Sequence, residues 1–397
     1  MSLFAELTNS VNAVRPTRTT MRNYDLPLVV ATSLLVAIGI LMVYSAAIAL
    51  ADGPRFTNYG RYYFVMRQTL YVCAGLFVAA FVLTVPIEAW QRATVWIFII
   101  TTLLLVAVLI PGIGRRVNGA MRWLPIGPVT FQPSELMKIA ALLFTADYTI
   151  RKQDQMHSTL RGFLPIAVAL AVVAGLLLKE PDLGAVIVVV AISMGILFLG
   201  GINAHIFSGI ALLLTSAFAL IIWLSPFRTR RIFAYLDPWN PENVLKDSYQ
   251  LSHSLVAIGR GQWTGVGLGG SVEKLHYLPE AHTDFIMAVI GEELGFVGIL
   301  LMISLFGVLV HRCIEIGRQA IAMERPFGGL VAQGVGIWFG VQSFINIGVC
   351  LGLLPTKGLT LPLVSYGGTG IVMNLCAIAL VLRVDFENRN MMRGVRS

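Results

Sequence analysis

Ten long apolar runs dominate this chain, and each is long enough to cross a membrane as a helix. The hydrocarbon core of a bilayer is about 30 Å thick, which a helix spans with about 20 apolar residues. The sequence therefore predicts an all-α polytopic membrane protein with about ten transmembrane helices. The runs cover residues 27–49, 68–86, 92–111, 134–150, 162–178, 183–200, 205–224, 284–310, 328–352 and 367–383.

The amino-acid composition agrees with this interpretation. Hydrophobic residues make up 56% of the 397 residues and charged residues 13%, whereas soluble domains contain about 45–50% and about 25%. The fifth and sixth runs are separated only by the short turn from Lys179 to Asp182, so the even number of spans depends on that turn.

The distribution of Lys and Arg predicts the orientation. With both termini in the cytoplasm, the cytoplasmic segments carry fourteen basic residues and the short outer loops carry eight, which agrees with the positive-inside rule. The predicted organisation is a cytoplasmic tail at 1–26, a transmembrane domain at 27–384 and a cytoplasmic tail at 385–397. One large loop, residues 225–283, joins spans seven and eight and faces outward. The polar first tail lacks the pattern of a cleavable signal peptide.

The side chains argue against several kinds of site. Four cysteines lie in or beside the apolar runs without paired spacing, which indicates neither a disulfide framework nor a zinc site. The net charge of +8 is spread over termini and loops, which favours membrane topology and anionic lipid contact over nucleic-acid binding. The glycine-dense stretch "GRGQWTGVGLGG" fits two interpretations equally: backbone amides that approach an anion, or a flexible connection.

Carboxylates gather at the predicted outer ends of the spans. Asp284 begins the eighth run, where we expect Thr283 to cap the helix and Asp284 either to complement the helix dipole or to serve a function. Glu135 and Lys138 stand three residues apart near the outer end of the fourth run. This spacing predicts an ion pair along one helix face or a pair that faces a cavity.

Cations gather on the same side, against the positive-inside trend. Arg115, Arg116 and Arg122 precede the fourth run, and Lys357 lies in the proline-broken segment "LPTKGLTLPLVSYGGTG" before the tenth. Irregular backbone at membrane depth must line a cavity or be buried in protein. Carboxylates, cations and bent apolar walls on one face suit an amphiphile with an anionic head group.

Five motifs resemble those of the SEDS family of bacterial membrane glycosyltransferases: "FQPSELMK", "EPDLG", "LDPW", "YLPEAHTDFIMAVIGEELG" and "KGLTLPLVSYGG". The resemblance runs from the first span to the tenth. The wording around His282 and Lys357 is closer to the cell-division branch of the family than to the elongation branch. The closing "GGTG" departs from the family pattern by one residue, which we expect to matter little.

The resemblance implies polymerisation of lipid II, the undecaprenyl-pyrophosphoryl disaccharide-peptide, into septal peptidoglycan. A sugar 4-hydroxyl attacks the anomeric carbon of the donor with inversion, and undecaprenyl pyrophosphate departs. The acceptor hydroxyl needs a base, whereas the pyrophosphate needs cations more than a proton, so one carboxylate suffices where a glycosidase needs two. By this logic and by the family pattern, Asp284 is the candidate general base.

The outer cations and the resemblance supply candidate substrate-binding residues. Arg122, Lys138 and Lys357 are candidates for holding the pyrophosphates, with Glu135 as their partner or as ligand of a divalent cation. The resemblance implies a Mg²⁺ or Mn²⁺ requirement, although the sequence contains no metal-spaced cluster. The full set of substrate-binding candidates is Arg116, Arg122, Glu135, Lys138, His282, Lys357 and Ser365.

The resemblance also implies partners and a location. It implies a class B penicillin-binding transpeptidase, other membrane proteins of the divisome, and a place in the bacterial inner membrane at the division septum. Two other classes of function stay open. A flippase for lipid II predicts charges near the bilayer midplane and paired broken helices in two repeated halves. A non-catalytic scaffold for the transpeptidase predicts no loss of function when Asp284 becomes Asn.

Overall fold

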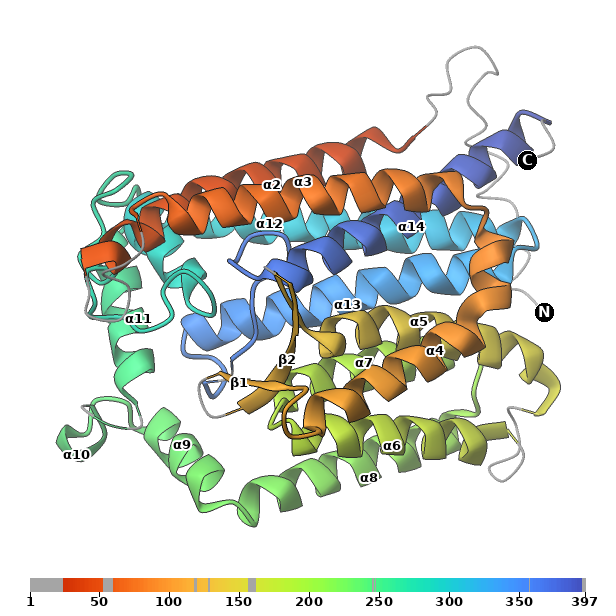
Figure 1. Ribbon diagram of the computed structural model, residues 1–397, viewed down its shortest axis with the longest axis horizontal. Helices are drawn as coiled ribbons and strands as arrows, with labels where there is room; N and C mark the ends of the chain where they lie inside the picture. Colours follow the sequence, from red (N-terminus) through yellow and green to blue (C-terminus); the bar gives the residue numbers. More distant parts are fainter. Residues whose placement is uncertain are drawn as a thin grey trace.

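Over the residues that it describes, the computed structural model forms a bundle of ten long helices, one for each predicted run (Figure 1). It describes residues 24–52, 60–117, 120–127, 129–155, 162–244, 246, 248–356 and 358–394. The prediction of a polytopic helical protein with about ten spans is confirmed. The helices are α2 (Leu26–Ala47), α3 (Tyr63–Thr84), α4 (Ile87–Leu109), α5 (Pro133–Arg151), α6 (Leu164–Lys179), α7 (Leu183–Leu199), α8 (Ala204–Trp223), α12 (Ile286–Ala322), α13 (Pro326–Cys350) and α14 (Gly368–Met392).

The helices differ in how they meet lipid. In the part of the chain that the structure describes, six are long and apolar enough to cross a membrane: α2, α3, α4, α12, α13 and α14. Shorter apolar helices are α6, α7 and part of α8. The helix α5 is different, because it carries several charges and nearly all of its side chains are buried by neighbouring helices. Charged side chains of a span are expected to face the protein interior in this way.

A small antiparallel sheet lies between α4 and α5 and was not predicted. Strand β2 (Ala120–Ile126) pairs with β1 (Arg115–Val117) on one side and with β3 (Val129–Phe131) on the other. Two of the three strands have only three residues, which is too short for an alternating apolar pattern to be recognised. The sheet carries Arg115, Arg116 and Arg122 on a regular element next to α5 rather than on an irregular loop.

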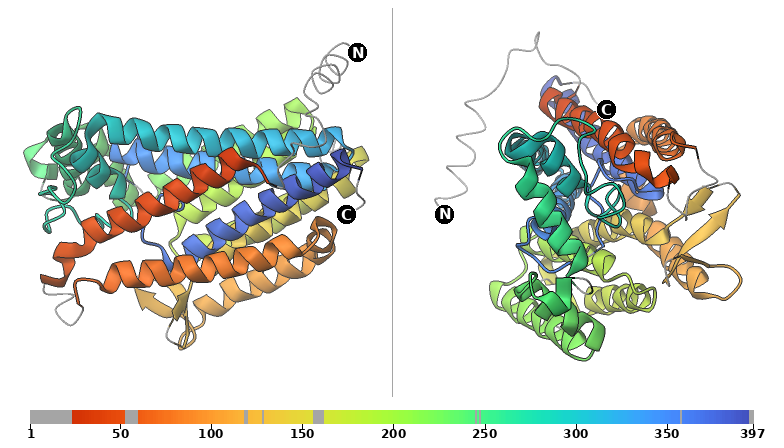
Figure 2. Two further views of the ribbon diagram at one scale, coloured as in Figure 1. Left: turned by 90° about the horizontal axis from the view of Figure 1, so that it is seen from above. Right: turned by 90° about the vertical axis from the view of Figure 1, so that its left-hand side faces the viewer.

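The predicted large loop contains three helices. They are α9 (Pro226–Leu236), α10 (Pro241–Val244) and α11 (Tyr249–Gly261). The helix α11 crosses one end of the bundle and packs on α12, while α8 and α9 lie at the periphery (Figure 2). We call this the outer end. The start of α2 and the end of α14 lie at the opposite end (Figure 1).

The last helix runs further than the sequence suggested. Residues 385–392, assigned to a tail, continue α14, and Asp385 is fully buried. The apolar pattern ends before the helix does because ion pairs rather than apolar contacts hold its last turns. Glu387 pairs with Arg383 and Arg325, and Asp385 pairs with Arg389.

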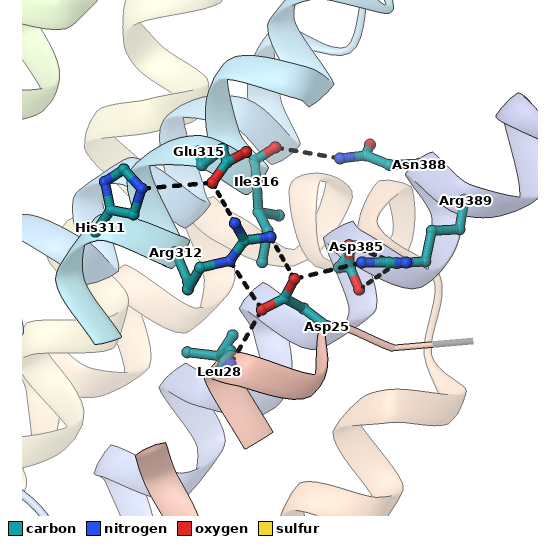
Figure 3. Close-up of polar contacts among 9 residues, drawn as sticks. All are labelled: Asp25, Leu28, His311, Arg312, Glu315, Ile316, Asp385, Asn388 and Arg389. Atoms are coloured by element: carbon teal, nitrogen blue, oxygen red, sulfur yellow. Dashed lines mark hydrogen bonds and ion pairs between the residues drawn. The ribbon is translucent and has the colours of Figure 1, made fainter. Parts of the chain in front are cut away.

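An ion-pair cluster ties three helices together at this opposite end (Figure 3). Arg312 of α12 donates through Nε to Asp25 Oδ1 at 3.0 Å, just before α2. Arg389 of α14 donates through Nε to Asp385 Oδ1 at 2.9 Å and lies 3.4 Å from Asp25. Both carboxylates are buried, and removing one partner of a buried ion pair typically costs about 3–5 kcal/mol. The cluster therefore fixes α2, α12 and α14 to one another at this level.

The helix α12 is interrupted at Gly295, whose φ of 67° lies outside the helical region. The stretch 262–267 replaces the helical hydrogen bonds that are lost at the break. Its backbone both donates to and accepts from α12 there: Val266 N to Glu292 O at 3.0 Å, Gly267 N to Glu293 O at 3.1 Å, Phe296 N to Gln262 O at 2.8 Å and Val297 N to Trp263 O at 3.2 Å. The break is thus satisfied internally, as membrane depth requires.

The glycines of this stretch allow the close approach. A Cβ atom on Gly261 would lie 1.9 Å from the carbonyl oxygen of Gly291, and one on Gly265 would lie 2.1 Å from that of Glu293. The structure therefore gives these two glycines a packing role against the broken helix. Neither of the two interpretations drawn from the sequence, an anion site or a flexible connection, describes them.

Two buried carboxylates of α12, Glu292 and Glu293, bind residues of the loop that precedes this helix. Glu293 accepts from Lys274 Nζ at 2.6 Å and from Ser45 of α2 at 2.7 Å. Glu292 pairs with Arg260 at 2.7 Å and accepts from the backbone nitrogen of Val272 at 2.9 Å. These contacts attach residues 260–274 to the part of α12 that lies before its break at Gly295.

We expect cysteine labelling to place the two ends of the bundle on opposite sides of the membrane. Tyr277 is 51% exposed at the outer end, and the side chain of Arg92, near the start of α4, is 83% exposed at the other end. In a background without the four native cysteines, which are unpaired, Tyr277→Cys should react with an impermeant maleimide from outside. Arg92→Cys should react only after permeabilisation. Labelling of both from the same side would contradict the ten-span topology.

Candidate functional site

Asp284 is half-buried and lies in the turn that leads into α12 at the outer end. The helix begins at Ile286, so the prediction that Thr283 caps it is wrong. The Thr283 hydroxyl instead donates to the carboxylate of Glu280 at 2.7 Å, and the Glu280 carbonyl accepts from the backbone nitrogens of Thr283 and Phe285. This local turn competes with the helix for the same donors, and the Asp284 carboxylate takes no part in capping α12.

Asn346 of α13 holds the backbone of Asp284 in place. Its side-chain nitrogen donates to the Asp284 carbonyl at 2.8 Å and to the Leu359 carbonyl at 2.6 Å. A Cβ atom on Gly358 would lie 3.0 Å from Asp284 Oδ2. The proline-broken segment before α14 therefore packs directly against the Asp284 carboxylate.

The part of that segment from Leu361 to Ser365 is buried in protein, one of the two environments that the sequence predicted for irregular backbone at this depth. Leu361, Leu363 and Val364 are at most 1% exposed. Ser365 donates to the Thr283 carbonyl at 2.6 Å and accepts from the Leu361 nitrogen at 2.8 Å. Because its hydroxyl already donates and accepts within the protein, Ser365 positions the Asp284 turn from behind.

His282 lies in an aromatic environment. It is 8% exposed, and its ring centroid lies 5.0 Å from that of Phe64 and 5.6 Å from that of Tyr366. Burial lowers the pKa of His282, against an opposing effect of Glu280, so the ring is neutral at pH 7. The backbone nitrogen of Tyr366 donates to the His282 carbonyl at 3.0 Å, which joins this residue to the same segment.

Glu135 and Lys138 form the ion pair that their spacing predicted, at 2.7 Å. The Lys138 side chain is 1% exposed, whereas the Glu135 side chain is 13% exposed. Lys138 also donates to Gln342 Oε1 at 3.2 Å, and Gln342 donates to the Thr360 carbonyl at 2.8 Å. The pair is therefore linked through Gln342 to the segment that contacts Asp284.

The remaining predicted cations lie on or near the sheet. Arg122 of β2 donates through Nε to the Glu180 carbonyl at 3.1 Å and through a second nitrogen to the Pro181 carbonyl. Its charge also lowers the pKa of Asp284, so it lies within electrostatic range of that carboxylate. Arg116 of β1 is exposed, and Lys357 lies outside the described residues.

The pKa of Asp284 is raised to about 7. Burial is the largest cause, because a charged carboxylate loses hydration there. The neighbouring carboxylates of Glu280 and Asp182 raise the pKa further, and Arg122 partly offsets them. A carboxylate whose pKa lies near the working pH is suited to general-base catalysis, since it is largely ionised and still binds a proton well.

Two further ionisable residues belong to this region and were not among the predicted site residues. Glu180, in the turn between α6 and α7, is fully buried, and neither of its carboxylate oxygens has a hydrogen-bond partner among the described residues. Burial, with a smaller contribution from Asp182, raises its pKa to about 8, and Arg122 opposes the shift. Glu180 is therefore mostly neutral at pH 7.

The other residue is Arg67 of α3. It donates to the Tyr63 hydroxyl at 2.6 Å and to the Tyr71 hydroxyl at 3.2 Å, and no acidic partner is found among the described residues. An arginine inside an apolar stretch was the signal that could have identified it. The sequence interpretation began the second span at residue 68 and so treated Arg67 as a flanking charge.

The described residues contain no group of three His, Cys, Asp or Glu side chains that could together hold a metal ion. The carboxylates near Asp284 are instead used singly. Asp182 accepts from the Ala185 nitrogen at 3.1 Å and from Ser134 at 3.2 Å, and Glu135 pairs with Lys138. The donor set does not fit a metal site built by the protein alone.

Comparison with known sequences gives a consistent result. The family model for FtsW, RodA and SpoVE, described as "Cell cycle protein", matches residues 26–390. A probable peptidoglycan glycosyltransferase FtsW from Burkholderia thailandensis is 55% identical over 98% of this chain and 84% of its own length. One from Polynucleobacter necessarius is 56% identical over 98% of this chain and 92% of its own length.

Solved structures agree. A chain from a structure titled "Structural coordination of polymerization and crosslinking by a peptidoglycan synthase complex" superposes with a TM-score of 0.73 at 29% identity, over 92% of this chain and 98% of that chain. The crystal structure of the rod shape determining protein RodA from Thermus thermophilus gives a TM-score of 0.66 at 28% identity, over 92% and 97%.

Proposed function

The chain belongs to the FtsW/RodA/SpoVE family of cell cycle proteins, and from this membership we propose that it polymerises lipid II into septal glycan strands during bacterial cell division. Its relatives are named peptidoglycan glycosyltransferases, which favours an enzyme over a flippase or a scaffold. The observation that carries the mechanism is Asp284. It is a partly exposed carboxylate at the outer end, with a pKa of about 7, on a turn that hydrogen bonds from Asn346 and Ser365 hold in place.

In the proposed reaction, Asp284 accepts the proton of the acceptor 4-hydroxyl as that oxygen bonds to the anomeric carbon of the donor sugar. The bond from this carbon to the pyrophosphate oxygen breaks, and its electron pair leaves with undecaprenyl pyrophosphate. Attack opposite the leaving group inverts the anomeric centre. Asp284 then releases its proton to water. Asn346 and Ser365 position the base, since both bond backbone atoms of its turn.

The leaving pyrophosphate requires positive charge, because its negative charge grows as the glycosidic bond breaks. We assign this role to Arg122 and Lys357, with Arg67 and Arg116 as further contacts for the anionic head groups. Glu135 and Lys138 support the segment through Gln342, and Glu135, in the first turn of α5, keeps a partly exposed side chain. His282, neutral and packed on aromatic rings, lines the acceptor side.

A Mg²⁺ or Mn²⁺ requirement remains a proposal that rests on the family. Because the described carboxylates do not converge on one point, we assign no step to a metal held by the protein. Glycan synthesis measured with EDTA and then with added Mg²⁺ or Mn²⁺ tests the requirement.

We also propose the partners and the location. A relative in the fold comparison comes from a peptidoglycan synthase complex that couples polymerisation to crosslinking. A class B penicillin-binding transpeptidase is the corresponding partner for this chain, together with other divisome membrane proteins. The protein would act in the bacterial inner membrane at the septum, with both termini in the cytoplasm.

The direct test uses purified protein, with and without its cognate transpeptidase, incubated with labelled lipid II. Glycan ladders on a gel are the expected result in at least one of the two conditions. Unreacted lipid II in both conditions, from protein shown to be folded, would contradict the proposed activity.

The pH dependence of the reaction should report on Asp284. Since only the ionised carboxylate accepts a proton, kcat should fall about tenfold per pH unit below pH 7 and level off above it. Glu280→Gln removes a negative charge that raises the pKa of Asp284, while the Gln oxygen can still accept from Thr283. The acidic limb should therefore move to lower pH.

The matched control is Glu88→Gln, which removes an exposed carboxylate at the opposite end of the bundle. Its acidic limb should coincide with that of the unmodified protein. A limb that Glu280→Gln leaves in place would show that another group sets the pH dependence.

A further inference from the structure

The helix α9 comes directly after a span. The helix α8 ends at Trp223, which is 75% exposed, and α9 begins three residues later at Pro226. Exposed tryptophan at the end of a span is typical of the membrane–water interface. From there α9 turns away from the direction of α8 and leads toward α11, which crosses the outer end (Figure 1). The helix α9 therefore begins at the level of the outer lipid head groups.

Large apolar side chains of α9 point away from the protein. Phe233 is 65% exposed and Leu236 is 69% exposed, and Trp239 just beyond the helix is 57% exposed. Ala234, between them in sequence, is 1% exposed and faces the protein. Tyr235 makes the anchoring contact, a hydrogen bond from its hydroxyl to the Leu353 carbonyl at 2.9 Å. One side of the helix is thus docked and the other presents an apolar surface.

All the charged residues of α9 are basic. Its sequence "PFRTRRIFAYL" contains three arginines in eleven residues and no acidic residue. Arg230 is exposed. The helix α9 belongs to the loop 225–283, which the sequence predicts to face outward. A basic helix with exposed aromatic and aliphatic side chains is typical of segments that lie in a membrane interface and contact anionic lipid.

We propose that α9 is an interfacial helix that binds anionic phospholipids of the outer leaflet. Phe233, Leu236 and Trp239 enter the acyl boundary, and the basic sequence of α9, which includes the exposed Arg230, binds lipid phosphates. The inference does not depend on Asp284 or on glycosyl transfer. It accounts for both the exposed apolar surface of α9 and its three arginines without an acidic residue.

Depth measurements test the placement of α9. A spin label at Phe233→Cys, in the cysteine-free protein in nanodiscs, should collide readily with oxygen and poorly with a water-soluble nickel chelate. The control label at Tyr277→Cys, exposed at the same end, should show the reverse. The proposal is wrong if the Phe233 label is as accessible to nickel as the control. It is also wrong if protection appears only with the transpeptidase present, which would make α9 a protein interface.

Lipid preference tests the arginines. Added phosphatidylglycerol should raise the thermal unfolding midpoint of the unmodified protein more than phosphatidylcholine does. Arg228→Gln, Arg230→Gln and Arg231→Gln combined should abolish this difference. The control, Arg92→Gln with Arg318→Gln, removes exposed charge elsewhere and should retain it. Retained preference in the triple variant would overturn the proposal.

The triple variant also distinguishes binding of lipid by the arginines from binding of the substrate. In nanodiscs that contain only phosphatidylcholine, the triple variant and the unmodified protein should have the same KM for lipid II, within twofold. A KM raised tenfold or more without anionic lipid would assign the arginines to the substrate pyrophosphate and would refute the lipid site. This outcome leaves the proposed glycosyltransferase activity intact.

Discussion

Replacing Asp284 with Asn should abolish glycan synthesis while the protein stays folded. A general base typically contributes about 10²–10⁴-fold to a rate, so labelled lipid II should yield ladders at least a hundredfold more slowly. The fold should survive because the Asp284 side chain caps no helix, and the Asn346 hydrogen bond is made to the backbone carbonyl. Burial disfavours the charged form, so the neutral amide should not lower the thermal unfolding midpoint.

Asp284→Glu is the matched companion. It keeps the carboxylate and moves it by one methylene, so a base that must reach the acceptor hydroxyl should lose most of its activity as well. Co-purification of the transpeptidase and an unchanged unfolding midpoint establish that both variants are intact. Normal ladders from the Asn variant would falsify the assignment of Asp284 as the general base.

Gly261→Ala should severely destabilise the protein. The new methyl group would lie 1.9 Å from the Gly291 carbonyl oxygen and 3.0 Å from the Glu292 Cα atom, both backbone atoms of α12 that cannot rotate away. Overpacking of this kind typically costs about 1–3 kcal/mol. Gly291 follows Asp284 by two helical turns, so displacement of α12 also misplaces the base. A lower unfolding midpoint in detergent and a loss of glycan synthesis should appear together.

Gly259→Ala provides a matched control in the same helix. A Cβ atom at Gly259 meets no atom within 4 Å. Ala stabilises a helix interior by about 1 kcal/mol relative to Gly, so this variant should equal or exceed the unmodified protein in stability. If the two variants behaved alike, the packing of α11 against α12 would not depend on Gly261.

Apolar length predicted the fold well because the bilayer fixes the length of each span. The turn from Lys179 to Asp182, on which the even number of spans depended, separates α6 and α7 as expected. The sheet and the continuation of α14 were missed for different reasons. The sheet strands are too short to show a period. The last turns of α14 are stabilised by ion pairs of Glu387 with Arg383, one turn earlier in the same helix, and with Arg325, which is distant in the sequence.

The candidate site was only partly predictable. Charges at the ends of runs identified Asp284 and the Glu135–Lys138 pair. The residues that hold the site together could not be predicted from the sequence. Asn346 and Gln342 are ordinary polar residues of a span in the sequence, and only the fold brings the carbonyls of Leu359 and Thr360 beside them. The expected cap at Thr283 failed because Glu280, six residues before the helix, takes the Thr283 donors first.

The ion-pair cluster of Asp25, Arg312 and Arg389 has a mechanical consequence. It holds α2, α12 and α14 at the end of the bundle remote from Asp284. Helices that are joined at one end can move apart only by pivoting about that end. Any relative movement of α2, α12 and α14 is therefore largest at the outer end. Such a movement would separate the three helices at the outer end and leave the end with the ion pairs closed.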